Sequence, residues 1–138
     1  MIANNFLKTI DLLHLSMDAN MIRRDVIADN LANSEVPNYK RTDLNFESQL
    51  KKALDSEKQK PVLDLRMSNL KHIPNWRPMD YRDVKPRRML DFATTAKNNG
   101  NNVDPEQEIM AGLKNQLSYY LFTQAMTFQF NQISMVLR

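Results

Sequence analysis

The sequence predicts a mainly α-helical protein. Long N- and C-terminal helices are expected to pair as a coiled-coil-like domain, with a short third helix and an irregular, proline-rich middle arm that can hold a small β element. Both ends carry apolar residues at helical spacing. Only two glycines occur in 138 residues, which argues against a loop-rich β sandwich. Four of the six prolines lie between positions 61 and 86, where they exclude long helices and central strands.

The N-terminal part, residues 4–33, is predicted to form one long helix that Asn4 or Asn5 can cap. No glycine or proline interrupts it. Its apolar side chains follow one another at steps of three, four or seven residues, which places them on one face: Ile10, Leu13, Met17, Met21, Ala28 and Leu31. Arg24 falls on the same face, where a shielded charge would need a partner.

The chain is expected to turn at Pro37, and Asp43 or Asn45 then starts a shorter helix that ends at about Lys58. The following arm carries the prolines. Apolar and charged residues alternate over 63–67, which predicts a brief extended strand there.

The second long helix is predicted to begin with Asp104 as its cap and Pro105 in the first helical position. It is predicted to continue to Arg138. Its apolar residues form two stripes. The first consists of Met110, Leu113, Leu117, Tyr120, Leu121, Ala125 and Phe128, and the second of Phe122, Met126, Phe130, Ile133 and Leu137. A helix that is apolar on two faces must be buried on both, and the N-terminal helix can cover only one. The remaining stripe predicts contacts between subunits, and we expect this role for the second stripe, around Phe130 and Ile133.

Chemistry-bearing patterns are missing from the sequence. The only histidines, His14 and His72, are far apart and lack a metal-ligand pattern, and no glycine-rich phosphate loop or cysteine occurs. We therefore expect no catalytic, cofactor or metal site. The net charge of +3 arises from residues 34–103, where fourteen bases mix with nine acids, unlike a nucleic-acid-binding face. No apolar run reaches the roughly 20 residues that span a bilayer, and the N-terminus does not resemble a cleavable signal peptide.

One run, residues 27–40, resembles a signature of the bacterial flagellar axial proteins, roughly A-x-N-x-A-N-x-x-T-P-G-Y. The matching residues are Ala28, Asn30, Ala32, Asn33, Pro37 and Tyr39. Val36 stands where that family usually has threonine, and Asn38 where it has glycine. Asn38 can still adopt the left-handed conformation that a type II turn requires at this position. We expect the helix to end before Pro37 and Asn38 to have a positive φ.

Further segments resemble the same family: the stretch 67–74 with its histidine, the G-N-x-V-D-P-E element at 100–106, and the N-x-L-x-Y pattern of Asn115, Leu117 and Tyr119. The combination is similar to the B-type component of the proximal rod, with the C-type component as the alternative within the family. An alternative from another class is a cytosolic helical binding module such as a secretion chaperone.

The resemblance implies a non-enzymatic structural subunit of the proximal rod, a helical tube in the periplasm that transmits motor torque and forms part of the export channel. Implied partners are copies of the same chain, other rod subunits, and ring or export-gate proteins. The subunit is implied to leave the cell through the flagellar type III apparatus without a cleavable signal. Residues 1–40 and 101–138 would form the inner helical domain and 41–100 a linker helix and outward-facing arm. Helix pairing and subunit contacts would use Leu13, Met17, Met21, Leu31, Leu113, Leu117, Phe122, Met126, Phe130, Ile133 and Leu137.

Overall fold

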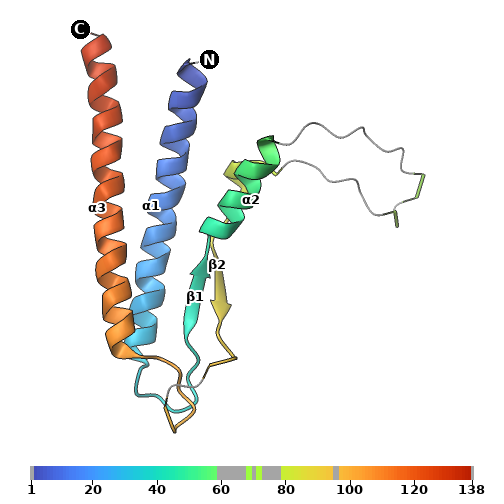
Figure 1. Ribbon diagram of the computed structural model, residues 1–138, viewed down its shortest axis with the longest axis vertical. Helices are drawn as coiled ribbons and strands as arrows, with labels where there is room; N and C mark the ends of the chain where they lie inside the picture. The colour runs from blue at the N-terminus through green and yellow to red at the C-terminus, as the bar shows by residue number, and fades with distance from the viewer. Residues whose placement is uncertain (1, 59–67, 70, 73–78, 95–96, 138) are drawn as a thin grey trace. The chain divides into compact units, whose positions relative to one another are not determined.

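The computed structural model describes residues 2–58, 68–69, 71–72, 79–94 and 97–137, with only the backbone for 2–5. The elements in chain order are α1 (Ile2–Ala32), β1 (Thr42–Asn45), α2 (Glu47–Lys58), the 3₁₀ helix η1 (Tyr81–Asp83), β2 (Arg87–Leu90) and α3 (Pro105–Val136) (Figure 1). The strand predicted over 63–67 lies outside the described residues. No helix in the described ranges is long and apolar enough to cross a membrane.

The chain divides into two compact units. The first joins Met1–Leu44 to Pro86–Arg138, and the second is Asn45–Lys85. The first unit contains the two long helices, and its two strands pair in a small sheet in which they run in opposite directions (Figure 1). The expected division, with 41–100 as an outward-facing arm, stays a prediction.

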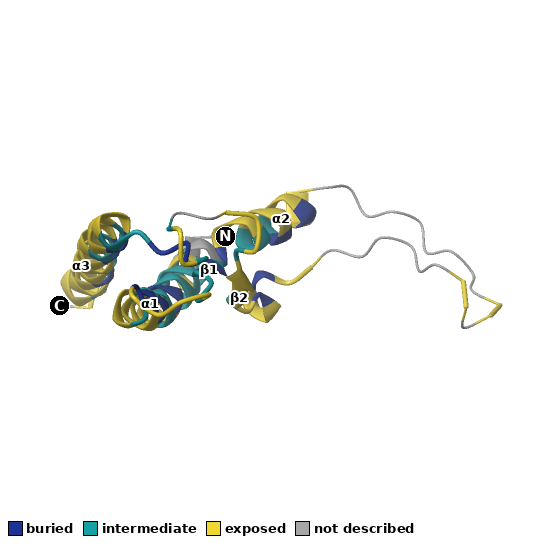
Figure 2. Ribbon diagram, turned by 90° about the horizontal axis from the view of Figure 1, so that it is seen from below, coloured by how far each residue is buried: buried dark blue, intermediate teal, exposed yellow. Residues whose placement is uncertain are grey.

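Helices α1 and α3 pack side by side, which confirms the predicted pairing, and the two chain ends lie at the same end of the pair (Figure 1). The burial is one-sided on each helix, and the outward face of α3 is exposed along most of its length (Figure 2). On α1 the core residues are Ala19 and Val26, and on α3 Met126 is buried. Buried asparagines share this face with them, namely Asn20, Asn30 and Asn115.

The apolar face of α1 differs from the predicted one in its second half. Leu13 and Met17 are half-buried as expected, but Met21 and Leu31 are exposed by 51% and 39%. Small and polar residues take the inner positions there because Ala19 permits close approach and the buried asparagines make hydrogen bonds across the helix pair. Arg24 is exposed, and its Nε lies 3.9 Å from the Asp25 carboxylate. Helix α1 already includes Asn4 and Asn5, so neither caps it.

The start of α3 confirms the predicted cap. The Asp104 carboxylate accepts a hydrogen bond from the backbone N–H of Glu106 at 3.0 Å, and Pro105 occupies the first helical turn. This arrangement satisfies one of the donors that a helix N-terminus leaves unpaired. The helix ends at Val136, and the N–H of the next residue, Leu137, donates to the Ile133 carbonyl at 3.0 Å.

The prediction that the short helix starts at Asp43 or Asn45 was wrong. Both residues belong to β1, and α2 begins at Glu47. The reason is tertiary: β1 pairs with β2, a strand on the far side of the proline-rich arm. Asn45 instead precedes the helix and accepts a hydrogen bond from the Ser48 hydroxyl.

The second unit has its own small core, to which α2 and η1 contribute. Its buried apolar residues are Phe46, Ala53, Tyr81 and Val84. The buried Ser56 links α2 to the segment before η1. Its hydroxyl donates to the Ala53 carbonyl within α2 at 2.6 Å and accepts from the Met79 N–H at 3.0 Å. Asp80 caps η1 by accepting from the Arg82 N–H at 2.9 Å.

Candidate functional site

The signature run ends α1 and forms a tight turn, as predicted. The Tyr39 N–H donates to the Val36 carbonyl at 3.4 Å, so Pro37 and Asn38 are the central residues of a β-turn. Asn38 has φ 61°, the left-handed value that a type II turn requires in its third position. The Asn38 N–H also donates to the Asn99 carbonyl at 3.0 Å, which attaches the turn to the segment before α3.

Asn30 is completely buried and uses its whole side-chain amide. Its Oδ1 accepts from the Thr42 N–H at 3.0 Å and from the Tyr39 hydroxyl at 3.4 Å. Its Nδ2 donates to the Thr42 carbonyl at 2.8 Å and to Oε2 of Glu108 at 3.3 Å. The Asn30 amide therefore pairs with the backbone of Thr42 as a neighbouring strand would. Through it, Thr42 is connected to α1, which carries Asn30, and to α3, which carries Glu108. This geometry explains Asn30 and Tyr39 of the signature.

The other signature residues have smaller roles within the chain. The Asn33 Nδ2 donates to the Asp29 carbonyl at 2.7 Å at the end of α1. Ala28 and Ala32 are exposed on the surface of α1.

A charged pair at the base of the helices was not predicted. The Arg41 Nε lies 2.6 Å from Oε1 of Glu108, whose side chain is 1% exposed, and Arg41 Nη1 lies 3.5 Å from Asp43. Burial alone lowers the pKa of Arg41, but the hydrogen bond and charge of Glu108, with Asp43 in addition, outweigh it and leave that pKa raised. The one available signal was the spacing: Glu108 precedes the buried Asn115 by seven residues and so lies on the same helix face.

An asparagine-rich cluster at 98–102 also closes the end of α1. Asn101 is completely buried, and its Nδ2 lies 3.0 Å, 3.0 Å and 2.9 Å from the carbonyl oxygens of Asn33, Ser34 and Val36. Its Oδ1 accepts from the Val103 N–H at 2.7 Å. The Asn33 and Val36 carbonyls also accept from the N–H groups of Val36 and Tyr39, and the Ser34 carbonyl accepts from Nζ of Lys97. Asn101 therefore adds a second donor to each carbonyl and ties the segment after α1 to the segment before α3.

Asn102 ties the same segment to the strands. Its Oδ1 accepts from the Arg41 N–H at 2.6 Å, and its Nδ2 donates to the Asp91 carbonyl at 2.8 Å. The Asp91 carboxylate accepts from the Thr94 hydroxyl at 2.7 Å and from the Ala93 N–H at 3.0 Å. The Thr94 hydrogen bond, followed by that from Ala93, lowers the pKa of Asp91. We call the set of Asn30, Arg41, Asn101, Asn102 and Glu108 the polar junction.

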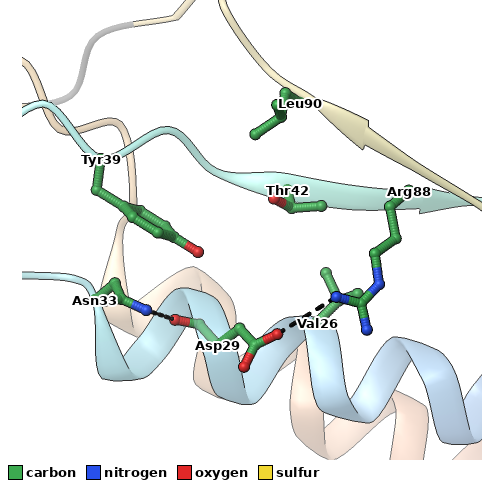
Figure 3. Close-up of a pocket in the computed structure, with 7 residues that line it drawn as sticks. All are labelled: Val26, Asp29, Asn33, Tyr39, Thr42, Arg88 and Leu90. Carbon is green, nitrogen blue, oxygen red and sulfur yellow. Dashed lines mark hydrogen bonds and ion pairs between the residues drawn. The ribbon is translucent and has the colours of Figure 1, made fainter.

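Beside the polar junction lies a pocket of about 490 Å³ (Figure 3). Its lining comes from the end of α1, the turn and both strands: Val26, Asp29, Asn33, Tyr39, Thr42, Arg88 and Leu90. Asp29 and Arg88 face each other across it, with Oδ2 and Nη1 separated by 3.6 Å. Because both side chains are more than half exposed, water screens this pair and it adds little stability.

The structure reverses the expected use of the two stripes on α3. The second stripe faces α1: Met126 is 9% exposed, and Phe122 and Ile133 are half-buried. Phe130 is 50% exposed, and Leu137, beyond the helix, is 81% exposed. The first stripe points away from α1. Six of its side chains are between 58% and 67% exposed: Met110, Leu113, Leu117, Tyr120, Leu121 and Phe128. We call these six residues the outer face of α3.

No family model matches the chain. It is similar to proteins named flagellar basal body rod protein FlgB from several bacteria. The protein of Borreliella burgdorferi is 42% identical over 135 residues, which cover 98% of this chain and 99% of the relative. The protein of Borrelia hermsii is 38% identical with the same coverage. The protein of Bacillus subtilis is 29% identical over 135 residues, which cover 96% of this chain and 95% of the relative.

Proposed function

The chain belongs to the family of the flagellar basal body rod protein FlgB, and we propose that it assembles with copies of itself and with other axial proteins into the helical tube of the proximal rod. It is a structural rod protein of the basal body. In this role it transmits motor torque and forms part of the export channel. It has no catalytic activity and binds no nucleic acid.

The observation that supports assembly is the outer face of α3. Six large side chains on one side of this helix are more than half exposed. At about 25 cal/mol per Å² of apolar area, leaving such a face in water forgoes several kcal/mol of stabilisation. Contiguous apolar patches of this kind mark protein–protein contacts on soluble proteins. Within the described residues α1 covers only the opposite face, so the outer face is available to another subunit.

The partners we propose are neighbouring copies, other rod subunits, and the ring or export-gate proteins at the rod base. A rod requires a head-to-tail contact that does not close into a ring, because such a contact propagates as a helix. The subunit is proposed to reach the periplasm through the flagellar type III apparatus. The paired helices would line the tube and the arm between them would project outward.

The alternatives are not favoured. The relatives named above are FlgB proteins rather than C-type rod subunits or secretion chaperones. A chaperone that wraps a partner helix would form a discrete dimer, whereas a rod subunit forms long oligomers.

Two measurements test the proposal. In the bacterium that encodes this chain, deletion of its gene should abolish motility and leave basal bodies without a rod, and reintroduction should restore both. Sedimentation of the purified chain at rising concentration should show growing oligomers. A stable dimer at all concentrations, together with intact rods in the deletion strain, would refute the proposed function.

A further inference from the structure

We propose that Met110 and Met135 of α3 are oxidation sites that regulate assembly: a peroxide that reaches the unassembled subunit converts their side chains to sulfoxides, and the modified chain no longer joins its neighbours. This inference rests on the proposed function. It deepens that function by naming a modification of the surface through which the subunit assembles, together with the class of oxidant that produces it.

Methionine is the only sulfur-containing residue type of this chain, which has nine methionines and no cysteine. Oxidation by peroxide therefore cannot be intercepted by a more reactive thiol of the same chain. The sulfur of a methionine has to meet the oxidant in solution. Which methionines are oxidised is thus decided by which sulfurs the fold exposes.

Helix α3 divides its three methionines between two sides. Met110 belongs to the outer face and is 67% exposed. Met135, in the last turn, is 76% exposed and lies on the same side, because about seven turns of 3.6 residues separate the two positions. Met126 lies on the opposite side, toward α1, and is buried. An oxidant in solution therefore reaches the two sulfurs on the assembly side before the one in the helix pair.

The neighbours of Met110 on the outer face are apolar. Leu113 and Leu117 follow it at helical spacing on the same side of α3, and both are more than half exposed. Met110 thus begins a row of side chains suited to an apolar contact. The thioether belongs in such a contact, because its sulfur is weakly polar and its unbranched chain adapts to the opposing surface.

Oxidation changes this side chain from apolar to polar. In the reaction with hydrogen peroxide, a lone pair of the sulfur attacks one peroxide oxygen, the O–O bond breaks and an S–O bond forms. The sulfur loses two electrons, the transferred oxygen remains as the sulfoxide, and the other oxygen leaves as water. The sulfoxide oxygen accepts hydrogen bonds, so enclosing it between apolar surfaces without a donor opposes the contact.

The fold of the subunit is spared by the same modification. Met110 and Met135 are exposed, so their sulfoxides remain in water as long as the subunit is unassembled. The buried Met126 keeps its thioether, and the packing of α3 on α1 is unchanged. Methionine sulfoxide reductases reduce the sulfoxide back to the thioether, which makes the block reversible.

Peroxide treatment of the purified chain tests the proposal. Mass spectrometry of proteolytic peptides measures the oxidised fraction of each methionine, circular dichroism follows the helix content, and sedimentation measures self-association. We expect sulfoxide to form at Met110 and Met135 at least about tenfold faster than at Met126. The treated chain should remain helical while its self-association weakens at least about tenfold.

Leucine variants separate the sites, because leucine has nearly the volume of methionine and cannot form a sulfoxide. The double variant Met110→Leu, Met135→Leu should keep its own untreated self-association within about twofold after the same peroxide dose. Met21→Leu is the matched control, since Met21 is also exposed but lies on α1, and this variant should lose association as the natural chain does. Methionine sulfoxide reductases A and B, supplied with a thiol reductant, should restore association of the oxidised natural chain.

Three outcomes would contradict the proposal. Equal losses in the double variant and the natural chain, or undiminished association when both sulfurs are oxidised, would overturn this regulation and leave the proposed function standing. Unfolding of the treated chain in parallel with its loss of association would do the same. An untreated chain that never self-associates would refute the proposed assembly and this regulation with it.

Discussion

Arg41, just before the first strand, and Glu108, in the first turn of α3, form an ion pair in which Nε and Oε1 are 2.6 Å apart. The glutamate is enclosed, whereas the arginine keeps 28% of its side chain exposed. The pair joins the chain after α1 to the start of α3 and has Asn30 as its third member. Such a pair is costly to break on one side, because the remaining charge loses its partner.

We expect Glu108→Gln to destabilise the fold by about 2 kcal/mol, below the roughly 3–5 kcal/mol for breaking a fully buried pair, because Arg41 is partly exposed. The control is Glu106→Gln, which removes an exposed acid from the same helix end and should cost less than about 1 kcal/mol. Urea unfolding of the purified chain, followed by circular dichroism, measures both. Equal losses would show that the ion pair adds nothing beyond the helix dipole.

The second prediction concerns Asn38 and Gly100, two residues with positive φ whose backbones lie close together. A Cβ on Gly100 would lie 2.6 Å from Oδ1 of Asn38, at a φ of 79°. Gly100→Ala should therefore cost at least about 1 kcal/mol from the left-handed backbone, and the clash adds to this cost. Asn38→Gly alone should change stability by less than about 0.5 kcal/mol, because asparagine tolerates this conformation well.

The double variant separates the two contributions to the Gly100 effect. In the Asn38→Gly background the clash disappears, so Gly100→Ala should cost less than in the natural chain. Thermal unfolding of the four proteins measures this coupling. Strict additivity would mean that the Asn38 side chain moves away without cost.

Part of this fold is predictable from sequence because its signals are local. The periodicity of the two ends predicts α1 and α3, and the Asp104–Pro105 pair predicts the helix start. The positive φ of Asn38 follows from a proline–asparagine pair after a helix. In each of these cases the residues that determine the conformation lie within a few positions of it.

The rest depends on partners that are distant in sequence. Thr42–Asn45 forms a strand because β2 and the Asn30 amide satisfy its backbone. In the sequence Glu108 resembles an ordinary first-turn acid, because its partners Arg41 and Asn30 are far away along the chain. The same holds for the stripes on α3, since their periodicity shows two apolar faces but not which of them α1 covers.

The third prediction concerns Asn101, which donates to the carbonyls at the end of α1. Asn101→Ala should destabilise the fold by about 2 kcal/mol, because the buried Val103 N–H loses its partner and each of the three carbonyls loses one of its two donors. Asn98→Ala, an exposed position in the same cluster, is the matched control and should cost less than about 0.5 kcal/mol. Hydrogen exchange at the Val103 amide should accelerate in the first variant only. Unchanged protection there would contradict a capping role for Asn101.

The fourth prediction is a pH dependence at Asp91. Its pKa is lowered in the folded chain, first by the Thr94 hydroxyl. The resulting stabilisation is present above the ordinary carboxyl pKa and is lost as the pH falls through the lowered value. Thr94→Val should raise the pKa of Asp91 toward its ordinary value, whereas Thr94→Ser, which keeps the hydroxyl, should not.

Carbon-detected NMR titration of the Asp91 carboxyl measures this pKa directly. Thr127→Val is a control, because the Thr127 hydroxyl donates to a helix carbonyl far from Asp91 in sequence. A pKa of Asp91 that does not respond to Thr94→Val would assign the shift to the backbone donors alone.

The fifth prediction separates the two faces of α3. Leu117→Lys places a charge on the outer face and should leave the unfolding temperature within a few degrees while abolishing rod incorporation and motility. Met126→Lys places the same charge in the buried face and should unfold the helix pair, since an unpaired charge cannot be accommodated there. If rods form normally with Leu117→Lys, the outer face is not part of the assembly surface.

The hydrogen bonds that join the two long helices also constrain the order in which the chain can fold. Asn30 and Glu108 are 78 residues apart, and Asn115 and Asn20 are 95 apart. Ordering such distant segments costs loop-closure entropy before any contact is gained, which makes this topology slow to form. A chain that emerges N-terminus first, from a ribosome or through a narrow channel, therefore holds α1 without its partner until almost its last residues have appeared. Completion of the fold is thus coupled to arrival of the C-terminus.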